Sequence, residues 1–152
     1  MTDIHIRTAQ PADLDALQAL FRRSSLNNDG DRAMLLANPD ALVLNSIAVN
    51  EQRTRAAVVD DNIVGFATLL RVGDAFELED LFVDPRWMRK GIGLALMRDA
   101  TAMASAAGVS RIEVTANPHA MAFYERAGFV PDGTAETRFG PAPRMRLDCR
   151  HA

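Results

Sequence analysis

The sequence has few of the residues that build disulfides, metal centres or nucleic-acid surfaces. Its 152 residues include a single cysteine, Cys149, which cannot form a disulfide within the chain. The three histidines are scattered, without the spacing that is typical of metal ligands. The net charge is −3, so the chain has no basic field that would attract nucleic acid or an anionic membrane. We therefore expect no metal, no nucleic-acid partner and no membrane partner.

Long apolar runs are also missing. The longest nearly apolar stretch, residues 63–70, is far shorter than the roughly 20 residues that span a bilayer. Asp3, Asp13 and Asp15 lie where a signal peptide would need a basic start and an apolar run. The length and an apolar content of 48% fit one globular domain. We expect a soluble, cytoplasmic protein that forms a single domain over residues 1–152.

Strand-like and helix-like patterns alternate along the chain. Short alternating segments predict strands at residues 4–7, 54–59, 63–71, 76–83 and 111–115, followed by a β-rich tail. Helical spacing predicts helices at residues 11–24, 32–37, 92–107 and 118–127, with turns at 27–31 and 60–62. Helices between strands predict an α/β fold with a sheet of mixed direction.

The long predicted helix has an apolar stripe that we expect to be buried. Gly108 follows this helix and Gly128 follows the next one, so both are predicted to end their helices as C-caps. The residues of the stripe recur at helical spacing: Ile92, Leu96, Ala100, Met103 and Ala107.

The most informative segment joins the predicted strand 76–83 to the long helix. Its glycines lie one residue apart, in Arg89-Lys90-Gly91-Ile92-Gly93. Glycine lets a backbone approach a ligand closely, and the first amides of a helix have no intrahelical partner. The positive end of the helix dipole lies at the same place. The segment therefore predicts an anion site for a phosphate or pyrophosphate, to which Arg89 and Lys90 add positive charge.

Two familiar phosphate motifs do not fit this loop. A Walker loop ends in Gly-Lys-Ser/Thr, whereas Leu94 follows Gly93 here. A dinucleotide-binding loop needs a third glycine, and Leu96 occupies that position. A tight turn between strand and helix, without any ligand, is the structural alternative.

A second motif lies at residues 117–129 and reads Asn-x-x-Ala-x-x-Phe-Tyr-x-x-x-Gly-Phe. Together with the glycine loop it resembles the GNAT superfamily of N-acetyltransferases, and the resemblance covers essentially the whole chain. The loop of that family reads Gln/Arg-x-x-Gly-x-Gly/Ala, which Gly91 and Gly93 match. Met88 stands at the Gln/Arg position. We expect this departure to weaken rather than abolish phosphate binding, with Arg89 compensating.

The resemblance implies a mixed central sheet that splays at its middle strands, with helices on both faces. It also implies acetyl-CoA as the cosubstrate, and Tyr124 as a general acid near the thioester sulfur. The residues implied to bind acetyl-CoA lie on the strand end, the loop and the second motif: Leu81, Phe82, Val83, Arg89, Lys90, Gly91, Ile92, Gly93, Leu94, Asn117 and Phe123.

Acetyl transfer to an amine needs a neutral nucleophile and a proton for the departing thiolate. Alkylammonium and tyrosine groups both have a pKa of about 10, so a carboxylate helps to deprotonate the amine and a neutral tyrosine can protonate the thiolate. We favour Glu79 as base or water holder, then Glu77 and then Asp80. Glu77 and Glu79 share one face of the strand, whereas Asp80 joins them only if a bulge shifts the phase.

Each candidate also has a structural interpretation. The strand acids could form a solvated face or an ion pair with Arg71. Tyr124 could be a core aromatic residue, and Asn117 could cap the following helix. Trp87 is expected to pack under the glycine loop, and Cys149 is expected to be a buried apolar residue rather than a nucleophile.

The acceptor stays open at this point. In the GNAT family its pocket is built by the first two helices and the C-terminal hairpin. Asn28 and Asp31 in the helical region suit a cationic amine, whereas Arg32 and Arg138 could hold a carboxylate. We expect an N-acetyltransferase that acts on a small primary amine by direct transfer in a ternary complex. The alternatives are a protein N-terminal or lysine acetyltransferase and a non-catalytic acyl-CoA sensor, and a homodimer is possible.

Overall fold

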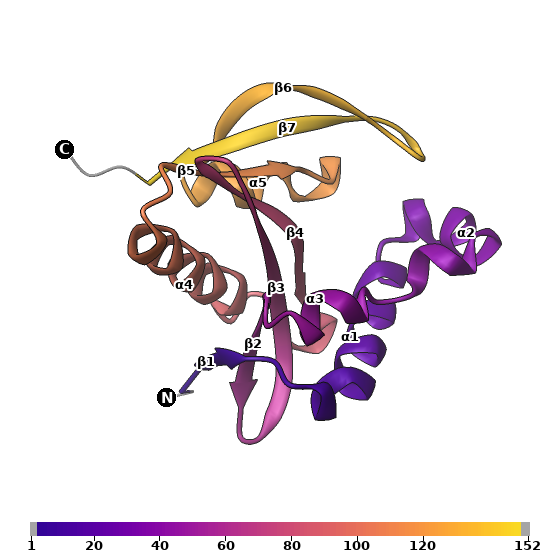
Figure 1. Ribbon diagram of the computed structural model, residues 1–152. Coiled ribbons are helices and arrows are strands. Elements are labelled where there is room, and N and C mark those ends of the chain that lie inside the picture. Colours follow the sequence, from indigo (N-terminus) through magenta and orange to yellow (C-terminus); the bar gives the residue numbers. More distant parts are fainter. Residues whose placement is uncertain (1–2, 150–152) are drawn as a thin grey trace. The chain divides into compact units, whose positions relative to one another are not determined.

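The computed structural model describes residues 3–149. They form a seven-stranded mixed sheet in the order β1-β2-β3-β4-β5-β7-β6, flanked by helices (Figure 1), which confirms the expected α/β class. The chain divides into two compact units. Unit 1 comprises residues 3–68 and 80–96, and unit 2 comprises residues 69–79 and 97–149. Strands β3 and β4 and helix α4 contribute residues to both units.

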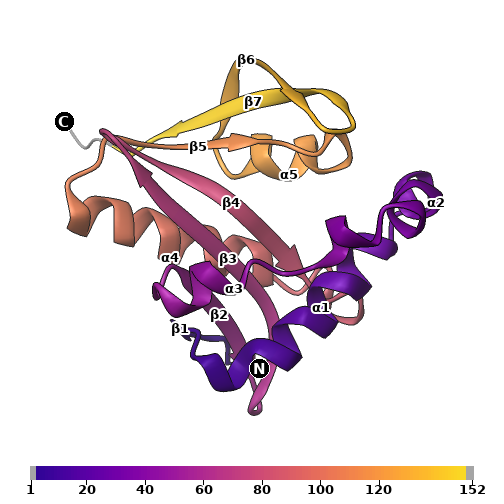
Figure 2. The same ribbon diagram turned by 45° about the vertical axis from the view of Figure 1, so that its right-hand side comes forward.

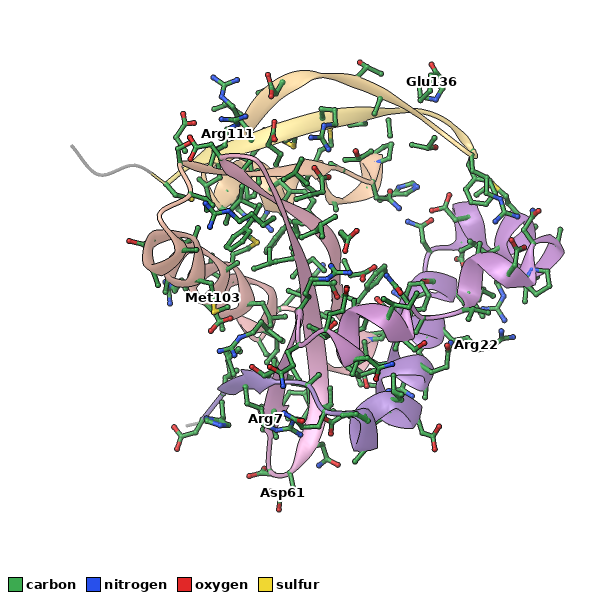
Figure 3. The ribbon with its side chains drawn as sticks, in the orientation of Figure 1. Arg7, Arg22, Asp61, Met103, Arg111 and Glu136 are labelled. Carbon is green, nitrogen blue, oxygen red and sulfur yellow. The ribbon has the colours of Figure 1, made fainter. Side chains whose placement is uncertain are left out.

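Unit 1 begins with an antiparallel pair of strands, β1 and β2, and β2 continues antiparallel to β3. The turn between β2 and β3 carries positive φ angles of 50° and 65° at Asp60 and Asp61, as a two-residue hairpin turn requires. Figure 3 shows Asp61 at the tip of this predicted hairpin. The elements of this part of the chain are β1 (His5–Thr8), a 3-10 turn (Pro11–Asp13), α1 (Leu14–Leu26), α2 (Asp29–Ala37), a second 3-10 turn (Pro39–Leu42), α3 (Ser46–Asn50), β2 (Thr54–Val59) and β3 (Asn62–Val72).

The segment between α1 and β2 is more helical than the sequence pattern predicted. Helix α2 begins at Asp29 instead of residue 32, because the side chain of Asn28 accepts a hydrogen bond from the Gly30 N–H at 3.0 Å and caps the helix. Asn45 caps α3 in the same way, through the Ile47 N–H at 3.1 Å. The predicted turn at residues 27–31 is therefore largely the start of a helix.

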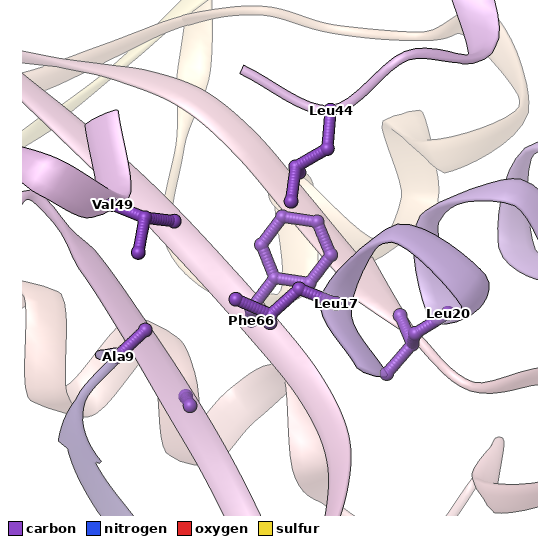
Figure 4. Packing of buried hydrophobic residues seen from close by; sticks show 7 residues of the cluster. Ala9, Leu17, Leu20, Leu44, Val49 and Phe66 are labelled. Carbon is purple, nitrogen blue, oxygen red and sulfur yellow. The ribbon is translucent and has the colours of Figure 1, made fainter. Parts of the chain in front are cut away.

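The core of unit 1 lies between α1 and the first strands. Phe21 and Phe82 pack against it with their ring centroids 4.9 Å apart. Burial of such apolar surface stabilises a fold by about 25 cal/mol per Å². Figure 4 shows the buried cluster, which consists of Ala9, Leu17, Leu20, Leu44, Val49, Ala56 and Phe66.

Unit 2 holds the C-terminal part of the sheet. Strand β4 pairs with β5 in parallel, whereas β7 runs antiparallel to both β5 and β6. Figure 2 shows the β6–β7 hairpin beside β5, with α5 lying along β5. The remaining elements of the chain are β4 (Ala75–Val83), a 3-10 turn (Pro85–Trp87), α4 (Ile92–Ala107), β5 (Arg111–Thr115), a 3-10 turn (Pro118–Ala120), α5 (Met121–Arg126), β6 (Val130–Thr137) and β7 (Gly140–Asp148).

Both predicted glycine C-caps are confirmed. Gly108 and Gly128 have φ angles of 72° and 103°, the left-handed conformation in which glycine ends a helix. After Gly108, the Val109 N–H donates to the Ala104 carbonyl at 3.1 Å, and the matching bond after Gly128 measures 2.9 Å. The sequence pattern therefore placed the ends of α4 and α5 correctly.

The buried face of α4 differs from the predicted stripe in its second half. The first three predicted positions are buried, and the stripe continues at Ala104. The prediction was wrong for Met103, which is 37% exposed (Figure 3), and for Ala107, which is also exposed. The buried positions follow the row of residues four apart, which is one of the two ridges that a helix can pack.

Gly65 on β3 offers a direct test of the packing in unit 1. A Cβ built at this position would lie 2.8 Å from Ile92 Cγ2 and 3.2 Å from Leu96 Cδ1. We expect Gly65→Ala to lower the free energy of unfolding by about 1–3 kcal/mol, measured by urea denaturation, because the first turn of α4 must move. Gly65 does not have a left-handed φ, so the steric clash is the expected cause, whereas Gly73→Ala would show the cost of its φ of 60° without a clash. An unfolding free energy for Gly65→Ala equal to that of the unmodified protein would contradict this packing.

Candidate functional site

The glycine loop connects β4 to α4 within unit 1. Asp84 ends the strand, and its carbonyl accepts a hydrogen bond from the Trp87 N–H at 2.8 Å, which closes the 3-10 turn. Arg89 and Gly91 then have φ angles of 62° and 80°. The Gly91 carbonyl accepts the helical hydrogen bond of the Ala95 N–H at 3.0 Å, so α4 begins directly after Gly91.

This geometry fits a bound anion. The first N–H groups of a helix lack intrahelical acceptors and carry partial positive charge. No atom lies within 4 Å of the place where a Cβ would stand on Gly91, so the backbone is accessible there. The side chains of Arg89 and Lys90 are exposed beside it, and Lys90 Nζ lies 6.0 Å from the centre of the Trp87 ring. The loop can therefore hold a phosphate or pyrophosphate through backbone amides.

A buried carboxylate anchors the start of this loop, and the sequence reasoning missed its role. The side chain of Asp84 is 2% exposed and forms ion pairs at 2.8 Å with Arg23 of α1 and Arg86 of the 3-10 turn. The hydrogen bonds from Arg86 outweigh burial and hold the pKa of the Asp84 carboxyl far below its usual range. The Asp-Pro pair that starts the turn was the available sequence signal, but it does not identify the partners.

The strand end before the loop is half-buried. Leu81, Phe82 and Val83 all lie in unit 1 with intermediate exposure. The Phe82 ring packs against Phe66 with centroids 5.5 Å apart, and against Phe21. A contact of Phe82 with a ligand would therefore come from its main chain rather than its ring.

The second motif lies in unit 2. The Tyr124 side chain belongs to α5 and is buried, with its ring centroid 5.4 Å from that of Phe123 and 5.2 Å from that of Phe129. Tyr124 is thus a packed aromatic residue, and its role as an acid stays a prediction.

Asn117 accepts a hydrogen bond from the His119 N–H at 2.9 Å, so it caps the turn that follows, which was one of its two expected roles. Its contact with the pantetheine arm stays a prediction.

The acids of β4 have different surroundings. Arg144 of β7 donates to Glu77 at 2.7 Å and to Thr115 at 3.0 Å, and its Nη2 lies 3.8 Å from Glu113. The hydrogen bond with Glu77 raises the pKa of the Arg144 guanidinium. Arg71, which was the alternative ion-pair partner for these acids, donates to the backbone carbonyls of Gly73 and Ala107. Glu77 is therefore neutralised by an arginine that lies 67 residues away in the sequence.

The other candidates fall into separate places. The Glu79 side chain is exposed in unit 2, whereas Asp80 is half-buried in unit 1. Asn28 and Asp31 lie at the start of α2, where Asn28 is occupied as the helix cap. Cys149 is buried, as predicted, and this burial raises the pKa of its thiol, so the thiolate is disfavoured.

Residues 3–149 contain neither a candidate metal centre nor a candidate membrane span. No three His, Cys, Asp or Glu side chains in this part of the chain are grouped as a metal ion would require. None of the helices described there is long and apolar enough to cross a membrane.

The comparison with protein families identifies the fold. The model of the acetyltransferase (GNAT) domain matches residues 36–142, which is more than half of the chain. The chain belongs to the GNAT family. No curated protein gives a significant sequence match.

Solved structures show the same fold over nearly the whole chain. The PaiA N-acetyltransferase of Thermoplasma acidophilum, solved with coenzyme A, is 20% identical with a TM-score of 0.75, over 96% of this chain and 99% of that one. The ribosomal-protein-S18-alanine N-acetyltransferase of Escherichia coli is 21% identical with a TM-score of 0.73, over 99% and 96%. A nourseothricin acetyltransferase is 27% identical with a TM-score of 0.59, over 64% and 65%.

These findings establish the class of reaction. The protein is an acetyltransferase that uses acetyl-CoA, as the resemblance implied. The glycine loop supplies what the pyrophosphate of such a cosubstrate requires, namely helix N-terminal amides, an accessible backbone at Gly91 and exposed cations.

A valine at Gly91 tests whether this loop holds the cosubstrate. Its side chain would fill the accessible space above the loop, so we expect Gly91→Val to abolish CoA binding measured by isothermal titration calorimetry. Gly73→Val is a matched control, because Gly73 also has a positive φ, of 60°, and open space around it. The two variants share the backbone strain, so equal CoA affinities would contradict the assignment of the loop.

Proposed function

We propose that this acetyltransferase transfers an acetyl group to the primary amine of a small molecule, directly and within a ternary complex. Acetyl-CoA supplies the acetyl group as a reactive thioester. The amides of residues 89–94 hold its pyrophosphate, and main-chain groups of Leu81, Phe82 and Val83 bind the pantetheine arm. Asn117 and Phe123 contact the arm from the second motif.

The observation that supports this proposal most directly is that Glu77 and Glu79, on the same strand, have different surroundings. Glu77 forms an ion pair with Arg144 at 2.7 Å, so its carboxylate is engaged within the protein. Glu79 lies two residues further along β4, at a position that is exposed to solvent. An exposed carboxylate can accept a proton from an ammonium group directly or through water. This supports Glu79 as the base and leaves Glu77 and Asp80 as secondary candidates.

Tyr124 is proposed as the general acid that protonates the departing thiolate. Two edge-to-face contacts, with Phe123 and Phe129, fix the plane of its ring. A phenol held in one orientation can deliver its proton to one fixed position, which is what acid catalysis requires.

A small acceptor is supported by the segment between α1 and β2. A groove for an extended peptide would need an open edge, whereas residues 29–50 are built mainly of helices. Gln18 of α1 holds this segment through hydrogen bonds to the Leu42 carbonyl at 2.7 Å and the Leu44 N–H at 2.8 Å. Asp29 and Asp31 in the first turn of α2 supply negative charge that suits a cationic amine.

A protein acceptor is the second candidate, because the E. coli neighbour is named as an alanine N-acetyltransferase of a ribosomal protein. The single-domain organisation, the cytoplasmic location and the homodimer stay predictions.

Thiol release from acetyl-CoA tests the proposal across polyamines, amino acids, aminoglycosides, arylamines and short peptides. Turnover with one of the small amines, absent with peptides, is the expected result. Turnover with peptides alone would favour the protein acceptor. Binding of acetyl-CoA without turnover on any acceptor would favour a sensor.

Replacement of Tyr124 by phenylalanine removes only the hydroxyl group. We expect Tyr124→Phe to lower kcat by about ten-fold or more, since general acid catalysis contributes at least that much, while the Kd of acetyl-CoA barely changes. Steady-state kinetics and calorimetry on the same preparation separate the two effects. A large loss of affinity with unchanged kcat would contradict the acid role.

Replacement of Glu79 by glutamine removes the proposed base. Without it, only amine molecules that are already neutral react, so we expect activity near pH 7 to fall by about ten-fold or more and to recover as the pH approaches the amine pKa. Glu113→Gln is the control, because Glu113 lies on the neighbouring strand β5 and has no proposed role. Identical pH–rate profiles for Glu79→Gln and the unmodified enzyme would contradict the assignment.

A further inference from the structure

Asp84 uses every polar atom that it has, although it lies outside the loop that is assigned to acetyl-CoA. Its Oδ1 accepts from the Arg86 N–H at 3.0 Å and from Arg86 Nε at 3.1 Å. Its Oδ2 accepts from Arg86 Nη2 and Arg23 Nη2, both at 2.8 Å. Its own N–H donates to the Val64 carbonyl at 2.8 Å, and its carbonyl accepts from Trp87. A buried carboxylate with this set of donors has one available position.

These bonds join three parts of unit 1. Val64 belongs to β3, Arg23 belongs to the last turn of α1, and Arg86 belongs to the 3-10 turn that leads into the loop. Met88 follows the turn, and the next residue, Arg89, is a non-glycine residue with a φ of 62°. A strained conformation of this kind persists only where the surrounding structure holds the chain in place.

We propose that Asp84 is a positioning residue for the acetyl-CoA loop, and that Arg23 of α1 acts on the loop through it. The carboxylate fixes the path of residues 85–88 and thereby the direction of the amides at residues 89–94. This inference rests on the proposed assignment of those amides to the pyrophosphate.

The sign of the effect separates positioning from simple electrostatics. Asp84→Asn removes a negative charge near a loop that binds an anion, so Coulomb attraction alone would tighten CoA binding. Loss of the anchor instead misplaces the amides and weakens binding. A weaker affinity of Asp84→Asn for CoA would therefore show that Asp84 acts by positioning the loop amides.

The first experiment measures the Kd of CoA for Asp84→Asn by calorimetry, on protein shown to be folded by circular dichroism. We expect the Kd to rise by about ten-fold, within the range of coupling found between contacting groups. Asp13→Asn is the matched control in the same unit. Asp13 also binds an arginine through both oxygens, at 2.8 and 3.0 Å, and accepts a backbone N–H, but it lies far from the loop in sequence. Its CoA affinity should be unchanged.

The second experiment combines Arg23→Gln with Asp84→Asn. Arg23→Gln alone should raise the Kd of CoA several-fold, and the double variant should bind no more weakly than Asp84→Asn, because both changes remove one anchor. Arg23 donates to Asp84 through a single nitrogen, so Arg23→Lys can keep that bond and should restore most of the affinity. If Asp84→Asn does not fold, the comparison of Arg23→Gln with Arg23→Lys tests the proposal instead.

Three outcomes would overturn the proposal. They are an unchanged or tighter Kd for Asp84→Asn, additive effects in the double variant, or a loss for Arg23→Gln that lysine does not rescue. A lower unfolding midpoint with unchanged CoA affinity would assign Asp84 to stability alone. Gly91→Val distinguishes this failure from failure of the loop assignment, since it should still abolish CoA binding when only the role of Asp84 is wrong.

Discussion

The side chain of Ile92, in the first turn of α4, packs so closely on β3 that residue 65 has no room for a Cβ atom. A Cβ at Gly65 would lie 2.8 Å from Ile92 Cγ2, well inside van der Waals contact. This close packing holds the start of α4 against β3. Residues 84–91 connect the end of β4 to this helix. Along this path Arg89 and Gly91 adopt the left-handed backbone conformation. The packing of α4 on β3 thus helps to hold the helix whose first amides form the candidate anion site.

Much of this arrangement could be predicted, because it depends on residues that are close in the sequence. Strands β2 and β5 begin and end where the alternating pattern placed them, and both glycine caps were found from one residue each. The glycine loop and the second motif are equally local, and together they were sufficient to indicate the family. The start of α2 was missed because an asparagine in a polar cluster, Asn28, fits either a turn or a cap, and only the folded chain distinguishes them.

The partners of the charged residues could not be predicted in this way. Arg23 and Asp84 are 61 residues apart, and Glu77 and Arg144 are 67 apart, so each pair depends on how strands and helices pack. Several arginines were equally plausible as partners from the sequence alone. The same limit applies to Phe82, whose ring turned out to belong to the apolar core.

The acids on and after β4 show how packing assigns different roles to identical chemical groups. Glu77 and Asp84 are each bound by arginine, whereas Glu79 lies at an exposed position of β4. The guanidinium groups beside Asp84 hold the pKa of its carboxyl far below the usual range, so this carboxylate stays ionised and serves as an anchor. The exposed position of Glu79 makes it accessible to a substrate.

A buried anion beside a loop that must attract another anion would be unfavourable if its field reached the ligand. Asp84 avoids this because Arg23 and Arg86 together carry one more charge than it does, so the group has a net charge of +1. The carboxylate is 2% exposed, while the Arg86 side chain is 72% exposed. Solvent and ligand therefore meet the cations first. One residue can in this way supply the rigidity of an ion pair at the loop without reducing its attraction for a pyrophosphate.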